Sequence, residues 1–114
     1  MRYYMKLRSK PFYKIQSGQK TFELRLYDEK RKQLKVGDEI EFSCLDADEA
    51  PFVVRVIALH HFDSFAELYA SLPLLKCGYT EDTIDDANPD DMNKYYSIEE
   101  QRQYGVIGIE IELI

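Results

Sequence analysis

The chain has 114 residues, with 15 basic and 21 acidic side chains and a formal net charge of −6. Apolar residues make up 45% of it, which supplies a hydrophobic core and excludes an intrinsically disordered chain. The length suits a single domain over residues 1–114, and no apolar run approaches the ~20 residues that cross a bilayer.

The cysteine content bears on the cellular location of the protein, and its net charge bears on the ligands it can bind. Two cysteines, Cys44 and Cys77, are too few for a disulfide scaffold, so a reducing cytoplasm is the simplest location. We expect no binding to long duplex DNA, because duplex phosphates usually need a broad basic surface. A small basic site inside an acidic protein stays open.

The first half of the chain predicts several strands and one short helix. Residues 3–7 read as a strand, and a helix of barely two turns then ends at Gly18. Residues 21–27 alternate with a period of two, which predicts a strand with one buried face. Residues 39–42 form another alternating strand, and the apolar run at 52–62 indicates a central strand covered on both faces.

The second half predicts grouped helices and a closing strand. Capping boxes begin at Ser64 and Ser97, and Asn88 starts a further helical stretch between them. Residues 107–113 then alternate as a last strand. This order favours an α+β fold with a mostly antiparallel sheet. Curling that sheet into a small β-barrel shields its edges, with short flanking helices and a helical insert before the last strand.

The segment from Gly18 to Arg25 concentrates the polar chemistry. If the apolar residues of this strand face the core, Thr21, Glu23 and Arg25 share its other face. Glu23 and Arg25 are then close enough to pair, which lowers the pKa of the carboxylate. Lys20 directly follows the glycine turn, so its direction stays open. The plain alternative is a solvated ion pair contributing less than ~1 kcal/mol.

The pattern G-x-K-x-x-E-x-R, formed by Gly18, Lys20, Glu23 and Arg25, resembles the motif of the ASCH family, relatives of PUA-like RNA-binding barrels. Its flanks are also similar, from the short helix before it to the closing strand, and the resemblance extends over essentially the whole chain. It implies a barrel with a cleft beside the motif strand, where members are thought to bind RNA or nucleotides.

By this resemblance, Lys20, Glu23 and Arg25 would line the cleft and bind RNA, a nucleotide or a nucleoside. The planar guanidinium of Arg25 suits a phosphate or a carbonyl. Phe12, beside the motif, is a candidate to stack on a base, although tyrosines of the insert are alternatives. The basic segment 30–35 is either a phosphate-contacting loop or a solvated turn.

Two other functions stay open. Some small bacterial members look like amidohydrolases that act on N4-acetylcytidine, and others have been described as ribonucleases. In the amidohydrolase branch a threonine nucleophile occupies the position of Glu23, so Thr21 is the nearest hydroxyl here and Lys20 a candidate base. Glu81 is the nearest match for that branch's further catalytic glutamate. The remaining alternative is a non-catalytic protein-interaction module whose charged strand face only solubilises it.

The sequence predicts no metal and no cofactor. His60 and His61 are adjacent, so on a strand they point to opposite faces and cannot jointly hold one ion. Both cysteines are distant from them in sequence.

Overall fold

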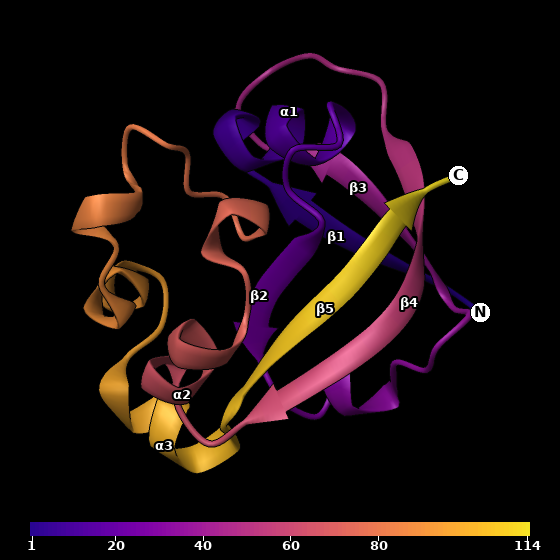
Figure 1. Cartoon of the computed structure of the whole chain (residues 1–114). Helices are drawn as coiled ribbons and strands as arrows, with labels where there is room; N and C mark the ends of the chain where they lie inside the picture. The colour runs from indigo at the N-terminus through magenta and orange to yellow at the C-terminus, as the bar shows by residue number, and fades with distance from the viewer.

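The computed structural model describes residues 1–114, and its strands lie beside a group of short helices (Figure 1). The strands are β1 (Arg2–Leu7), β2 (Phe22–Leu26), β3 (Glu39–Cys44), β4 (Phe52–Phe62) and β5 (Val106–Leu113). The α-helices are α1 (Ser9–Gln16), α2 (Phe65–Ser71) and α3 (Ile98–Tyr104). Short 3₁₀ helices are η1 (Arg31–Gln33), η2 (Leu74–Lys76), η3 (Ile84–Asp86) and η4 (Pro89–Lys94). No helix is long and apolar enough to cross a membrane.

One curled five-stranded sheet has the order β1-β3-β4-β5-β2. β1 runs parallel to β3, and the segment through α1 and β2 is the crossover connection that a parallel pairing requires; the other three pairings are antiparallel. The predicted α+β fold with a mostly antiparallel sheet is confirmed. Since β1 and β2 remain edge strands, the sheet forms a half-barrel whose backbone ladder does not close.

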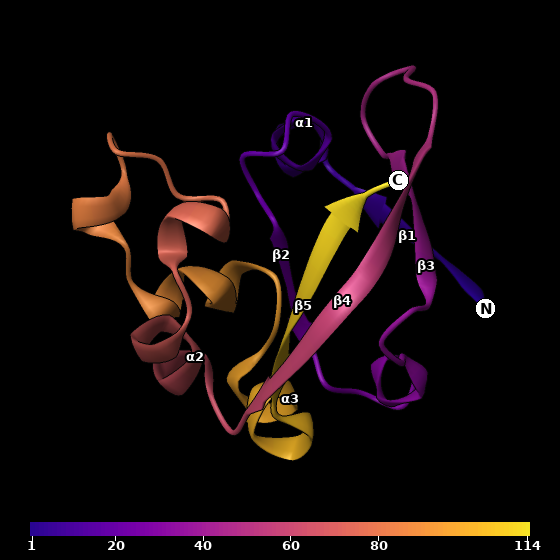
Figure 2. The same cartoon turned by 45° about the vertical axis from the view of Figure 1, so that its right-hand side comes forward.

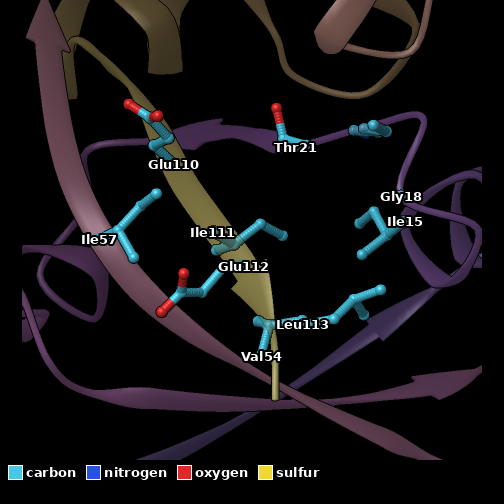
Figure 3. Close-up of a pocket in the computed structure, with 10 residues that line it drawn as sticks. Ile15, Gly18, Thr21, Val54, Ile57, Glu110, Ile111, Glu112 and Leu113 are labelled. Carbon is cyan, nitrogen blue, oxygen red and sulfur yellow. The ribbon is translucent and has the colours of Figure 1, made fainter.

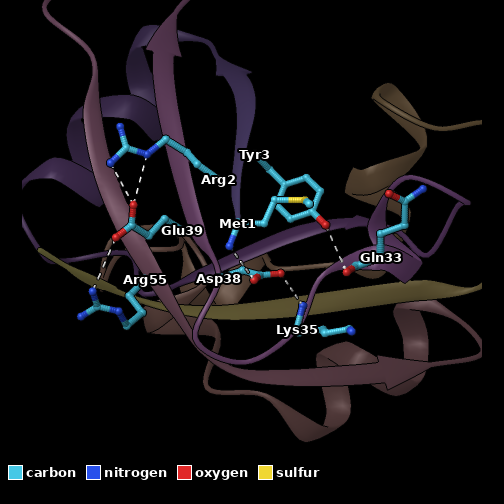
Figure 4. Close-up of polar contacts among 8 residues, drawn as sticks. All are labelled: Met1, Arg2, Tyr3, Gln33, Lys35, Asp38, Glu39 and Arg55. Atoms are coloured by element: carbon cyan, nitrogen blue, oxygen red, sulfur yellow. Dashed lines mark hydrogen bonds and ion pairs between the residues drawn. The ribbon is translucent and has the colours of Figure 1, made fainter.

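Ion pairs fix the register at the start of the parallel pairing (Figure 4). Glu39 accepts from Arg2 of β1 at 2.8 Å and lies 3.6 Å from Arg55 of β4. The N-terminal amine lies 3.3 Å from Asp38. These groups are partly exposed, so we assign them a role in register and little stability.

The interior divides into two hydrophobic clusters. The larger lies inside the curled sheet and under α1, and the smaller lies between β2 and the insert. Phe12 belongs to the larger cluster, where it is fully buried and its ring centre lies 4.8 Å from that of Phe52. Phe12 therefore has no exposed surface on which a base can stack.

Both faces of β2 are covered, which differs from the single buried face expected from its alternation. Phe22, Leu24 and Leu26 pack in the smaller cluster against the insert. Glu23 and Arg25 lie opposite Ile109 and Ile107, whose side chains belong to the larger cluster. β4 is a central strand of the sheet, as predicted. One of its faces is less covered than expected, because Ile57 is 39% exposed.

The insert between β4 and β5 lies on the β2 side of the sheet in both views (Figures 1 and 2). Its α-helices begin as predicted, with Ser64 and Ser97 accepting hydrogen bonds from main-chain N–H groups three residues on. The insert packs closely on β5. A Cβ atom added to Gly108 would stand 2.5 Å from Leu72 Cδ1, so any side chain there requires Leu72 to shift.

Candidate functional site

A buried ion triad forms at the start of β2 from three of the predicted site residues. Glu23 Oε1 lies 3.0 Å from Lys20 Nζ, and Glu23 Oε2 accepts a hydrogen bond from Arg25 Nε at 2.8 Å. Glu23 is only 4% exposed and Lys20 only 9%. The charged face is therefore not a solvated surface, which removes the main support for a purely solubilising role.

The charges of the triad stabilise one another. Burial acts to raise the pKa of Glu23, but the attraction of Lys20 and Arg25 outweighs it and lowers the pKa to about 2. Burial likewise acts to lower the pKa of Arg25, and the neighbouring Glu23 raises it overall. Glu23 is consequently a carboxylate at neutral pH and holds two cations in fixed positions.

Contacts between the end of α1 and the insert position Lys20. The chain reverses at Gly18, whose φ is +86°, and Lys20 N–H donates to the Lys14 carbonyl. Lys14 Nζ donates in turn to the Gly78 carbonyl at 2.6 Å. Thr21 N–H donates to the Lys76 carbonyl at 2.8 Å. Lys20 is thereby held against the insert. The alternation of residues in the sequence had left the direction of its side chain open.

The triad borders a cleft of about 700 Å³ between the β1–α1 region and the insert. Lys20 and Arg25 line it, and Glu23 lies behind them. Further basic lining residues are Lys6, Arg8, Lys10, Lys14 and Lys94. Aromatic lining residues, all from the insert, are Tyr69, Tyr79, Tyr95 and Tyr96. Only two carboxylates, Asp86 and Asp91, line the same cleft.

The cleft is lined mainly by basic side chains, although the protein as a whole has a net charge of −6. Five of its basic side chains take part in no ion pair, namely those of Lys6, Arg8, Lys10, Lys14 and Lys94. Burial, together with Lys10 and Lys20, lowers the pKa of Lys14, as expected where positive charges crowd. Unpaired cations around a hollow favour an anionic ligand.

Thr21 lies apart from this cleft. It lines a second, smaller hollow of about 350 Å³, with Ile57, Glu110 and Glu112 (Figure 3). Lys20 lines both hollows, whereas Arg25 lines only the larger. Thr21 and Arg25 therefore line different hollows, and the structure does not bring the hydroxyl and the guanidinium to one ligand position.

The remaining candidates lie outside both hollows. Glu81 is exposed and lines neither. In the basic segment 30–35, Arg31 forms a part-buried pair with Asp28 and Lys32 an exposed pair with Glu29, and neither basic residue lines either hollow. His60 contacts Glu110 at 3.0 Å, and the His61 ring lies 4.2 Å from that of Tyr27. No group of three His, Cys, Asp or Glu side chains is arranged to hold a metal.

Beyond the ion triad, sequence reasoning considered only Tyr95 and Tyr96 of the cleft walls, among the insert tyrosines that are alternatives for stacking on a base. Lys6, Arg8 and Lys10 stand at every second position around the junction of β1 and α1, a pattern visible in the sequence. On the insert wall, Tyr69 and Tyr79 gave no comparable signal. Tyr69 and Tyr79 are ten residues apart in the sequence, and the fold of the insert brings their hydroxyl oxygens to 2.7 Å from each other.

The half-barrel and its basic cleft define a PUA-like α+β protein. The ASCH domain model matches residues 5–114, so the chain belongs to the ASCH domain family. Two solved structures are similar along the whole chain. The crystal structure of hypothetical protein PH0355 is 32% identical, with 100% of both chains covered and a TM-score of 0.84. The solution structure of protein PF0455 from Pyrococcus furiosus is also 32% identical, with 100% of this chain and 98% of that chain covered and a TM-score of 0.76. No curated protein matched the chain.

Proposed function

We propose that this protein binds a ribonucleotide unit in the basic cleft, either as a free nucleotide or as part of single-stranded RNA. The observation that carries the proposal is the set of five lining cations without an ion pair, on a protein that is acidic as a whole. Phosphates bind such cations, and bases stack on aromatic side chains such as those of the insert wall.

The shape of the cleft supports a ligand of this size. Its volume of about 700 Å³ lies within the ~300–1,000 Å³ typical of small-molecule sites. A nucleoside offers no anion to the five cations, so the phosphate-bearing unit is the better fit. A long duplex is too wide for a cleft of this volume, and the acidic remainder of the surface repels its phosphates.

Binding is better supported than hydrolysis. The carboxylate of Glu23 is committed to Lys20 and Arg25, and its low pKa leaves it without a proton to donate at neutral pH. The Thr21 hydroxyl lines the other hollow, and Glu81 is exposed. The three side chains that an amidohydrolase interpretation needs together with Lys20 therefore do not converge on one substrate position.

Calorimetric titration tests the proposal with four probes: adenosine, AMP, a mixed-sequence RNA hexanucleotide and a long DNA duplex. We expect AMP and the hexanucleotide each to bind with higher affinity than adenosine and the duplex. For a single strand, log K should fall with log salt with a slope of about −0.7 for each phosphate contact. Tighter binding of the hexanucleotide indicates RNA as the source of the unit, whereas tighter binding of AMP indicates the free nucleotide.

Two double variants with the same change of net charge separate the cleft from general electrostatics. Arg8→Glu/Lys10→Glu reverses two exposed cleft cations, and Lys30→Glu/Lys35→Glu reverses two exposed cations outside it. We expect the cleft variant to weaken binding at least roughly tenfold, about 1.4 kcal/mol, and to flatten the salt dependence. Equal effects of the two variants, or no binding by the unaltered protein, contradict the proposal.

A further inference from the structure

A chain of three hydrogen-bonded side chains crosses the insert wall of the cleft. The hydroxyls of Tyr69 in α2 and Tyr79 lie 2.7 Å apart, and Tyr79 donates to Asp91 Oδ2 in η4 at 2.8 Å. All three residues line the cleft. None belongs to the ion triad, and the proposed function does not use their hydroxyl chemistry.

The direction of these hydrogen bonds follows from the groups themselves. A carboxylate only accepts hydrogen bonds, and a phenol has one proton to give. Tyr79 gives its proton to Asp91, whose Oδ2 also lies 3.3 Å from the Asn88 main-chain N–H. The Tyr79 oxygen must then accept from Tyr69. Burial, with the contacts to Tyr69 and Asp91, raises the pKa of Tyr79, so this proton stays in place at neutral pH.

Tyr69 therefore faces a ligand as an acceptor only. Its single proton is committed to Tyr79, and its oxygen keeps a free lone pair, because no further hydrogen bond to it is present. The opposite wall has the reverse character, since the ammonium and guanidinium groups of Lys6, Arg8 and Lys10 only donate. The cleft is thus polarised across its width.

This polarity orients a bound ribonucleotide unit. Aromatic lining residues all come from the insert, whereas most unpaired cations come from the β1–α1 side. The base accordingly belongs against the insert wall and the phosphate against the β1–α1 wall. A base held there contacts the acceptor oxygen of Tyr69. An exocyclic amino group on the base can donate a hydrogen bond to this oxygen, whereas a keto oxygen leaves two acceptors facing each other.

We propose that Tyr69 selects nucleotides whose base carries an exocyclic amino group, and that Tyr79 and Asp91 act as positioning residues by fixing its proton. This inference rests on the proposed function and names the class of base that the same cleft prefers. It requires no chemical step, since the discrimination is one of binding alone.

Paired ligands that differ in a single amino or keto group test this selection. The probes are CMP against UMP, AMP against IMP, and the cytidine against the uridine hexanucleotide, titrated calorimetrically into the full chain. We expect the amino member to bind roughly tenfold more tightly than its keto partner. Equal binding of both members overturns the inference and leaves the proposed function intact, whereas absence of binding by every probe contradicts both.

Phenylalanine variants tie the selectivity to the hydrogen-bond chain. Tyr69→Phe removes the acceptor, and Tyr79→Phe frees Tyr69 to donate as well as accept. We expect both variants to retain binding and to bring the affinity ratio of amino to keto ligands close to one. Tyr104→Phe, also in the insert but outside the cleft, should keep the wild-type ratio. A ratio unchanged in both cleft variants overturns the role assigned to Tyr69.

Discussion

Arg25 on one edge strand of the sheet donates a hydrogen bond to the main-chain carbonyl of Lys6 on the other edge strand, with 3.2 Å between Nη2 and the oxygen. The same guanidinium pairs with Glu23 at 2.8 Å. One side chain therefore spans the opening that the backbone ladder leaves between β1 and β2, and it does so beside the basic cleft. The fold and the candidate site depend on the same residue.

Arg25→Lys should destabilise the protein although it keeps the charge. A lysine cannot bond Glu23 through two nitrogens and reach the Lys6 carbonyl as well. We expect the free energy of unfolding to fall by about 1–3 kcal/mol in urea denaturation. Arg2→Lys, which alters a more exposed pair with Glu39, should cost less than ~1 kcal/mol. Similar losses in the two variants would argue against the bridging role.

Glu23→Gln should be among the more damaging single changes in this chain. It removes the only carboxylate of the buried triad and leaves Lys20 and Arg25 without a counter-charge. Breaking a buried pair in this way costs about 3–5 kcal/mol. Chemical denaturation at pH 7 measures the loss. Glu29→Gln is the matched control, because the Glu29 side chain is 84% exposed and its pairing with Lys32 should contribute almost nothing.

Acid should destabilise the protein in a window set by Glu23. Its pKa falls from an ordinary 4.5 to about 2 on folding, so the unfolded chain takes up the proton first. The contribution of this group is complete above pH 4.5 and is lost as the pH falls toward 2. Its size is on the order of 3 kcal/mol.

Denaturation of the wild-type protein and Glu23→Gln across that window isolates the effect. Asp38, Glu39 and Asp46 also have lowered pKa values, but both proteins share them. The stability difference between the two proteins should therefore shrink as the pH falls. A difference that stays constant from pH 7 to pH 2 would contradict the assignment.

Gly108→Val should loosen the insert. The new side chain would meet Leu72 Cδ1, which stands 2.5 Å from the position of an added Cβ. Overpacking of this kind costs about 1–3 kcal/mol. Urea denaturation measures the loss, and faster hydrogen exchange at α2 amides locates it. Gly108→Ala, with the smaller side chain, should cost less; a wild-type stability for both variants would show that Leu72 moves aside freely.

The sequence was sufficient for the order of strands and helices, because alternation, capping boxes and turn glycines are local signals. It also predicted that Glu23 and Arg25 pair. It did not predict that the pair is buried, since the groups around it come from elsewhere in the chain: Lys20, which α1 and residues 76–78 hold in place, and the Lys6 carbonyl of the far edge strand. Periodicity identifies which residues share a face of a strand, but not what packs on that face.

The same limit of sequence periodicity explains why Phe12 and Thr21 lie elsewhere than predicted. Phe12 is a neighbour of the motif in sequence, yet it points into the core. Thr21 has the parity of Glu23, but it precedes the strand and lines a different hollow. Parity predicts which side of a strand a residue faces, but not which hollow along that side it lines.

NMR mapping of the ligand site is the most direct test of the basic cleft as a ribonucleotide site. A labelled sample is titrated with CMP, AMP and the RNA hexanucleotide, and the shifted signals are placed on the structure. We expect shifts at Arg8, Lys10 and Arg25 on one wall and at Tyr69 and Tyr79 on the other. Shifts confined to the smaller hollow around Thr21 and Glu112, or no shifts with any of the three ligands, would contradict it.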